Sequence, residues 1–265
     1  HLPYVAEAFP WLAEAGAAPF HSAEVPYLRQ IWVAGERHDD DPAWVDTIDL
    51  SIDATSALAD GIDDAVLDAV EAQVTPADRL CVIHTSGTTG YPKGVIHTHG
   101  AFLRHSDNLS KWHSLTSDFI QYSGLPWFWI GGLVLSIGQG LVRGYQLLCL
   151  ERFDNEQALD LIVEHKAHQI GMWGQLLQRF KLYVDASGRD VSMVPGLAKP
   201  AGGPVDPGLF HNSLGQTESL GPHTGPGPEA GRKLDERHRG SFGLRVPYVE
   251  HRIVDPATGE DLEPG

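Results

Sequence analysis

The stretch that decides our expectations is Thr85-Ser86-Gly87-Thr88-Thr89-Gly90-Tyr91-Pro92-Lys93-Gly94, which follows the apolar segment 80–83. It combines four Ser and Thr hydroxyls with three glycines and one lysine. Glycines let backbone N–H groups approach an anion closely, hydroxyls donate further hydrogen bonds, and the lysine supplies a positive charge. The stretch therefore predicts a loop that holds a polyphosphate.

Composition alone would also fit an ordinary surface turn, so the order of the residues matters more than their types. The order differs from the Walker spacing G-x-x-x-x-G-K-[ST], because Pro92 precedes Lys93 and Gly94 follows it. This difference disfavours a P-loop kinase or GTPase.

Apolar segments and helical periodicities alternate on both sides of the loop. Short apolar runs predict strands over 28–33, 80–83, 146–150 and 244–254, and periodic patterns predict helices over 62–74, 101–115, 156–166 and 175–184. Asp154 and Gln157 resemble a capping box, and Asp255 begins a turn that leads into a hairpin. The alternation predicts a layered α/β fold of mostly parallel sheets with flanking helices, followed by a β-rich C-terminal segment.

Length and charge exclude several classes of protein. A chain of 265 residues with 42% apolar and 20% charged residues is typical of globular proteins with a substantial core. The formal net charge of −16 disfavours nucleic acid and anionic lipid as partners. No stretch approaches the roughly 18–20 apolar residues of a membrane span. Two cysteines and no visible targeting peptide predict a reducing, cytoplasmic setting.

The ten residues from Thr85 to Gly94 match, position by position, the T-S-G-T-T-G-x-P-K-G phosphate loop of the adenylate-forming superfamily. This superfamily comprises acyl-CoA synthetases, peptide-synthetase adenylation domains and firefly-type luciferases, and the chain most resembles an acyl-CoA synthetase. Further segments that resemble the superfamily are Leu125-Pro126-Trp127-Phe128-Trp129-Ile130-Gly131-Gly132-Leu133, Ala201-Gly202-Gly203-Pro204, Asn212-Ser213-Leu214-Gly215-Gln216-Thr217-Glu218 and the run 240–247.

The resemblance implies roles for individual residues. The loop would bind the β- and γ-phosphates of ATP through Thr85, Ser86, Gly87, Thr88, Thr89, Gly90 and Lys93. Lys93, Thr217 and Glu218 would be catalytic, with Thr217 at the α-phosphate and Glu218 as the Mg²⁺ ligand. The adenine would lie among Gly202, Gly203, Asn212, Ser213, Leu214 and Gly215.

The expected acyl pocket departs from the superfamily pattern. It would comprise Trp127, Phe128, Trp129, Gly131, Met172 and Trp173. Leu214 replaces the tyrosine that packs on adenine, and Trp129 replaces a histidine. No aspartate within 127–130 could pair with a substrate ammonium, which favours a fatty, aromatic or alicyclic acid over an amino acid.

The implied activity is ATP-dependent conversion of a carboxylic acid to an acyl-adenylate, followed by thioester formation with CoA. The alternatives are transfer to a carrier protein or an amine, or a truncated nucleotide- or acyl-binding module without activity. Residues 1–265 would be part of the large N-terminal domain, with α/β structure and the phosphate loop in 1–200 and the adenine-side loops in 201–265. The sequence leaves a homo-oligomer open.

Three further expectations concern the chain's extent and its histidines. The small C-terminal domain would be absent, and we expect these 265 residues alone to adenylate poorly. Between Gly203 and Asn212 the chain is shorter than the superfamily pattern. His97 and His99 could suggest a metal pair, but a structural role at the strand–helix junction is the stronger interpretation.

Overall fold

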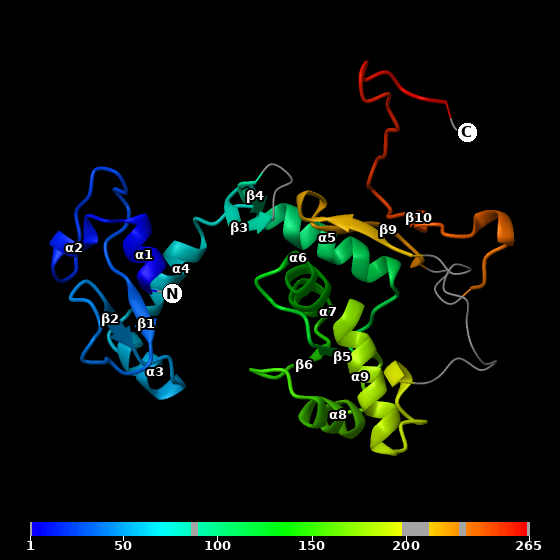
Figure 1. The fold of residues 1–265 in the computed structure, drawn as a ribbon, viewed down its shortest axis with the longest axis horizontal. Coiled ribbons are helices and arrows are strands. Elements are labelled where there is room, and N and C mark those ends of the chain that lie inside the picture. The colour runs from blue at the N-terminus through cyan, green and yellow to red at the C-terminus, as the bar shows by residue number, and fades with distance from the viewer. Residues whose placement is uncertain (1, 86–89, 198–211, 228–231, 264–265) are drawn as a thin grey trace. The chain divides into compact units, whose positions relative to one another are not determined.

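A computed structural model describes residues 2–85, 90–197, 212–227 and 232–263 of the chain (Figure 1). The chain divides into two compact units, residues 1–73 and residues 74–265. The predicted boundary near residue 200 falls among residues 198–211, which lie outside the described residues, so that division stays a prediction.

The first unit has four short helices and a two-stranded parallel sheet. The helices are α1 (Leu2–Ala8), α2 (Leu12–Ala15), α3 (Ile52–Ala59) and α4 (Asp64–Glu71), and the strands are β1 (Trp32–Ala34) and β2 (Asp46–Ile48). Its core consists of Leu12, Phe20, Trp44 and Val45. The strand predicted over 28–33 is wrong in extent and burial: only 32–34 pairs, and it is exposed because its sheet has just two strands.

The second unit contains the hairpin of β3 (Arg79–Thr85) and β4 (Lys93–Thr98), which are antiparallel. Helix α5 (His99–Trp112) follows β4 directly, and the Thr98 side chain caps it by accepting a hydrogen bond from the backbone N–H of Ala101 at 3.3 Å. The predicted strand over 80–83 and helix over 101–115 are confirmed with shifted ends. In the strand, however, only Ile83 is buried.

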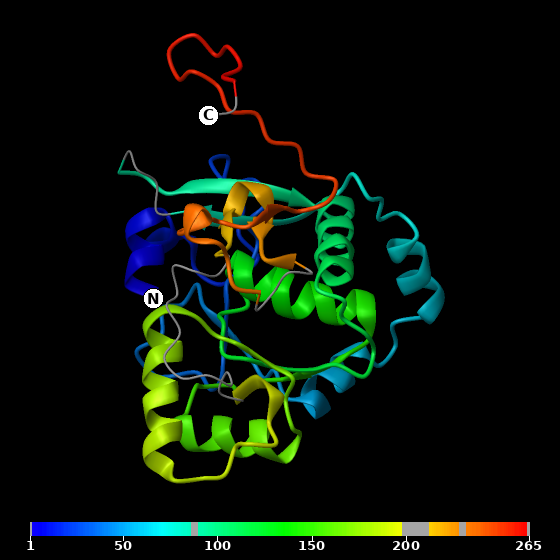
Figure 2. The same ribbon diagram turned by 90° about the vertical axis from the view of Figure 1, so that its right-hand side faces the viewer.

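A parallel three-stranded sheet lies at the centre of the second unit. Its order is β6 (Gln146–Leu148), β5 (Ile120–Ser123), β7 (Gln169–Gly171). Helices α8 (Asn155–Glu164) and α9 (Gly174–Ser187) pack on one face, and α6 (Ile130–Gly132), the π-helix η1 (Leu133–Gly138) and α7 (Gln139–Arg143) lie on the other (Figure 2). The first face is held by Tyr122, Leu159, Ile162, Phe180 and other buried apolar side chains. This confirms the predicted parallel pairing and both helices.

A third, antiparallel sheet has the order β10 (Leu244–Arg245), β9 (Gly221–Gly225), β8 (Leu214–Gln216). Short 3₁₀ turns occupy Pro195–Leu197, Thr217–Ser219 (η4) and Glu236–His238. The strand predicted over 244–254 is mostly wrong: beyond β10, only Val254 forms a bridge, to Asp261. That bridge closes the hairpin predicted at Asp255, whose carboxylate accepts hydrogen bonds from the next turn.

A second apolar cluster joins the hairpin, α5, η1 and the third sheet. Its buried members are Ile83, Phe102, Leu109, Trp112, Ile130, Val134, Leu220 and Val246. Because these residues come from segments far apart in the sequence, the cluster fixes the hairpin against the turn that carries Thr217. None of the helices within the described ranges is long and apolar enough to cross a membrane.

Candidate active site

The two ends of the predicted phosphate loop are held by the β3–β4 hairpin. Thr85 and Lys93 are register partners at the end of the hairpin that the loop connects. Ser86, Gly87, Thr88 and Thr89 lie outside the described residues. Gly90 has φ +97°, a left-handed value that favours glycine. The hairpin thus sets the anchoring points of the loop whatever the conformation between them.

Thr217 and Glu218 lie on the turn η4, between β8 and β9. The chain reverses there through two consecutive left-handed residues, Leu220 at φ +60° and Gly221 at φ +100°. The hydroxyl of Ser219 donates to the carbonyl oxygen of Gly221 at 2.8 Å and ties the turn together. A Cβ on Gly215 would lie 2.6 Å from the backbone of Gly221, so only glycine allows this close strand approach.

A cavity of about 1150 Å³ brings these segments together. Its lining includes the two ends of the loop, Thr85 and Lys93, and the residues Ser213, Gly215, Gln216, Thr217 and Glu218, which we call its polar end. Its apolar lining includes Trp112, Leu115, Phe119, Leu125, Trp129, Ile130, Leu135, Ile170, Met172 and Trp173. Most of the predicted site residues that the structure describes therefore face one space.

Charge in this cavity is concentrated at the polar end. Among its described lining residues, Lys93 is the only lysine or arginine and Glu218 the only carboxylate. Within the described part of the chain, no hydrogen bond or ion pair engages either side chain. An ammonium and a carboxylate that are free of protein partners can bind a phosphate oxygen and a hard divalent cation, respectively. The residues present therefore fit a magnesium–nucleotide complex.

The apolar end is shaped by a pair of tryptophans. The ring centroids of Trp129 and Trp173 are 5.3 Å apart with planes tilted by 60°. A Cβ on Gly131 would lie only 2.3 Å from Cη2 of Trp173, so glycine makes room for that ring. Met172 is buried beside them and contacts Gly124. The wall is bulky and aromatic, as expected for an apolar substrate group.

Several predicted residues lie elsewhere. Trp127 and Phe128 do not line this cavity, and Phe128 is 86% exposed. Leu214 is exposed on β8 and also lies outside the cavity wall. Asn212 donates its backbone N–H to the carbonyl oxygen of Ser241 at 2.9 Å. Gly202 and Gly203 lie outside the described residues.

Several lining residues escaped the sequence analysis, among them the polar residues Gln121, Gln139, His113 and His168. Gln121 stands between the apolar residues Ile120 and Tyr122, and a glutamine at such a position is a signal that could have been used. The other three residues occupy helix or loop positions at which polar residues are common, so nothing in the sequence distinguishes them.

His97 is buried on β4, and its Nε2 has no hydrogen-bond partner among the described residues. Burial lowers the pKa of His97, and the Thr217 backbone and the charge of Glu218 oppose this to a smaller extent. His99 instead begins α5. In the described ranges, no three His, Cys, Asp or Glu side chains are grouped as metal ligands.

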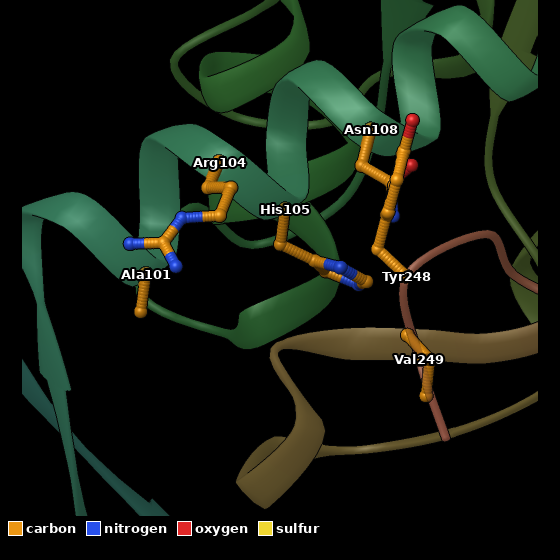
Figure 3. Close-up of a pocket in the computed structure, with 6 residues that line it drawn as sticks. All are labelled: Ala101, Arg104, His105, Asn108, Tyr248 and Val249. Atoms are coloured by element: carbon orange, nitrogen blue, oxygen red, sulfur yellow. The ribbon is translucent and has the colours of Figure 1, made fainter. Parts of the chain in front are cut away.

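A second, smaller cavity of about 510 Å³ lies between α5 and the C-terminal segment (Figure 3). Arg104, His105 and Asn108 reach it from α5, opposite Tyr248 and Val249. His105 Nε2 lies 3.0 Å from the carbonyl oxygen of Pro222, and Asn108 donates its amide to the carbonyl of Pro247. These contacts hold α5 against β9 and the segment after β10.

Comparison with known proteins shows the family of the chain. Residues 31–265 match the family model described as AMP-binding enzyme. Among curated relatives, 4-coumarate–CoA ligase 1 of Oryza sativa is 28% identical over 80% of this chain and 39% of its own length. Long-chain-fatty-acid–CoA ligase FadD13 of Mycobacterium tuberculosis is 36% identical over 42% of this chain and 22% of its own. The chain thus spans less than half the length of these curated relatives.

Among solved structures, O-succinylbenzoate coenzyme A synthetase of Bacillus subtilis in complex with AMP is similar in fold. It superposes with a TM-score of 0.60 at 20% identity, over 91% of this chain and 61% of that one. Since the family model covers most of the sequence, the chain belongs to the AMP-binding enzyme family within the adenylate-forming superfamily.

Proposed function

We propose that this protein activates a carboxylic acid with ATP to give an acyl-adenylate and pyrophosphate. The observation that carries the proposal is that one cavity is lined both by Lys93, Thr217 and Glu218 and by apolar aromatic side chains. Joining a nucleotide to an apolar acid requires both environments within one space.

In the proposed reaction, an oxygen of the substrate carboxylate attacks the α-phosphorus of ATP. The bond between that phosphorus and the oxygen bridging to the β-phosphate breaks, and pyrophosphate leaves with the electron pair. The attacking carboxylate is already ionised, so no protein nucleophile and no general base are needed. What the protein must supply is charge stabilisation and alignment of two anions.

We assign this stabilisation to the polar end of the cavity. Lys93 and the hydroxyl of Thr85, fixed across the hairpin, bind the departing phosphates, and Thr217 contacts the α-phosphate. Glu218, which has no partner among the described residues, holds Mg²⁺. When bound, the cation neutralises charge on the phosphate oxygens. We assign Ser86 to Thr89 to the same phosphates, and Gly202, Gly203, Ser213 and Gly215 to the adenine, whereas Asn212 and Leu214 do not line the cavity.

We propose CoA as the acyl acceptor, because the curated relatives reported above are named CoA ligases. The CoA thiolate would attack the acyl carbonyl carbon. The bond between that carbon and a phosphate oxygen of AMP would break, and AMP would leave with the electron pair. Transfer to a carrier protein or an amine is the competing outcome, and product analysis with each acceptor distinguishes them.

The test is ATP–pyrophosphate exchange by the longest form of the protein that its gene encodes, over a panel of carboxylic acids. We expect exchange that depends on an added fatty or aromatic acid and on Mg²⁺, with little response to amino acids. Exchange that no acid stimulates would overturn the proposal.

A further inference from the structure

The antiparallel sheet of the second unit has two neighbouring histidines that the proposed reaction does not use. His223 is the third residue of β9, and His251 lies in the segment that follows β10. Nδ1 of His223 and Nε2 of His251 are 3.1 Å apart, although 28 positions separate the two residues in the sequence. We name these two residues the histidine pair. His251 is exposed and His223 is half-buried, so an ion in solution can reach the pair.

The backbone that carries the histidine pair is fixed on both sides. The carbonyl oxygen of His223 accepts a hydrogen bond from the backbone N–H of Val246 at 3.0 Å, and Val246 is fully buried. The carbonyl oxygen of Val246 in turn accepts from the N–H of Val249 at 3.2 Å. On the other side, Nε2 of His105 lies 3.0 Å from the carbonyl oxygen of Pro222. The fold therefore sets the distance between the two histidines before any ligand arrives, as a preorganised site requires.

The geometry of the rings distinguishes two kinds of contact that a separation of 3.1 Å allows. A linear N–H···N hydrogen bond would place the ring centroids about 5.4 Å apart. An ion about 2.0–2.1 Å from each nitrogen would instead place the centroids about 4.8 Å apart, with an N–metal–N angle of about 98°. The observed centroids are 4.9 Å apart, and the ring planes are at 88° to one another. The rings therefore converge as two ligands of one ion do.

Protonation and charge around the pair are compatible with a cation. A neutral imidazole holds its proton on one nitrogen, so each ring can keep that proton on the nitrogen that faces away from the other ring. The cationic neighbour of His251 in the sequence is Arg252, whose Nε donates to the carboxylate of Asp261 at 2.9 Å. The formal net charge of −16 also favours a cation over an anion at the surface.

The ligand atoms determine which class of ion would bind. Imidazole nitrogens suit Zn²⁺, Ni²⁺ and Cu²⁺, whereas Mg²⁺ prefers oxygen ligands. We infer that the histidine pair binds a divalent transition-metal ion, such as Zn²⁺, and that the bound ion links β9 to the segment after β10. The inference needs only two protein ligands, since no third His, Cys, Asp or Glu within the described ranges is grouped with the pair.

This site is independent of the proposed function. Neither histidine belongs to the residues that line the large cavity, and the ion class differs from the Mg²⁺ that we assign to Glu218. Loss of ATP–pyrophosphate exchange would therefore leave the inference untouched, and loss of Zn²⁺ binding would leave the proposed function untouched.

The experiment is a calorimetric titration with Zn²⁺ of the chain without a histidine tag, in a buffer with excess Mg²⁺ to occupy sites made of oxygen ligands. We expect one Zn²⁺ per chain in the tightest class of sites. In His251→Ala and in His223→Ala the affinity of that class should fall by about tenfold or more, because each variant removes one of the two ligands. An unchanged tightest site in His251→Ala would overturn the inference.

Two further variants separate a shared ion from other binding. His238→Ala is the matched control, because His238 is an exposed histidine between β9 and β10, and it should keep the affinity of the wild type. An equal loss in His238→Ala would show adventitious binding to surface histidines and would overturn the inference. The double variant His223→Ala/His251→Ala should bind about as weakly as either single variant, since each single change already removes the chelate. Losses that add would contradict a shared ion.

The link between the two segments is tested by unfolding. At about a hundredfold excess over its Kd, Zn²⁺ should raise the midpoint of thermal unfolding of the wild type by about 5 °C, and a chelator should reverse the rise. His251→Ala should show no such rise. If His223→Ala fails to fold, His251→Ala decides, because an exposed side chain is replaced there. An equal rise in the wild type and in His251→Ala would contradict the link.

Discussion

Thr85 and Lys93 face each other as the last register pair of the β3–β4 hairpin, and both line the large cavity. Seven residues of the phosphate loop lie between them, so strand pairing fixes both ends of that loop. A lysine on a paired strand is held more precisely than one on a free loop, which favours a preorganised phosphate contact.

Replacing Lys93 by Ala should therefore affect chemistry far more than stability. We expect acid-dependent ATP–pyrophosphate exchange to fall by about a hundredfold or more, the scale for loss of one preorganised charge-stabilising donor. The midpoint of thermal unfolding should hardly change, because Lys93 is exposed and unpaired among the described residues. Lys181→Ala is the control, because Lys181 is an exposed residue of α9. Exchange like the wild type in Lys93→Ala would remove Lys93 from the site.

Glu218→Gln tests the assigned metal ligand separately from the phosphate loop. Loss of a ligand charge should weaken Mg²⁺ binding, so the Mg²⁺ concentration for half-maximal exchange should rise about tenfold or more. Glu164→Gln, at the exposed end of α8, provides the comparison. An unchanged Mg²⁺ dependence in Glu218→Gln, with exchange still active, would contradict the assignment.

Trp129→Ala should widen the range of acids that the enzyme accepts. The variant removes one of two rings that meet 5.3 Å apart at the carboxyl end of the sheet. For branched or longer acids that are poor substrates of the wild type, we expect kcat/KM to rise relative to kcat/KM of the preferred acid. These ratios are measured across the panel. Trp32→Ala, exposed in the first unit, should leave these ratios unchanged. An identical profile in Trp129→Ala would exclude Trp129 from the acyl pocket.

The sequence predicted well those helices that have a recognisable N-cap or a continuous apolar face. The helix over 156–166 has an N-cap, and the structure shows Asp154 accepting the N–H of Gln157 at 2.9 Å. The helix over 175–184 has a clear apolar face, which packs through Phe180 and Val184. The segment 244–254 failed because its apolar residues alternate like a strand while only Leu244 and Arg245 find a partner strand.

A fixed order of residues predicted that Thr85, Lys93, Thr217 and Glu218 share one site, and all four line one cavity, while their chemical roles stay predictions. The site was not predictable where packing decides. Trp127 and Trp129 stand two positions apart in the same segment, but of the two only Trp129 reaches the cavity. The direction of each ring depends on how the segment enters α6, which sequence spacing does not specify.

Phe180→Ala should be strongly destabilising. Phe180 is fully buried between α9 and the parallel sheet, with an edge-on contact to Phe153 at 6.0 Å. Truncation of a buried phenylalanine costs about 3–5 kcal/mol of unfolding free energy. Leu182→Ala on the same helix is the control, because Leu182 is 70% exposed and should cost far less. Urea unfolding of the two variants measures the difference, and similar losses would contradict the described core.

Asp107 gives the protein a stabilising contact that should depend on pH. A hydrogen bond from Lys111 at 2.6 Å and the charges of Lys111 and Arg143 hold the pKa of Asp107 below its usual value. Because the folded-state pKa is lowered, the contact stabilises above the unfolded-state pKa of about 3.9 and is lost as pH falls through the folded-state value. Asp107→Asn should therefore cost up to about 1 kcal/mol at neutral pH, since the carboxylate is partly exposed. The difference from the wild type in urea unfolding should vanish once the pH falls below the folded-state pKa of Asp107, and Glu164→Gln provides the comparison. A difference that grows on acidification would show that Asp107 does not stabilise the junction of α5 and α7 through its charge.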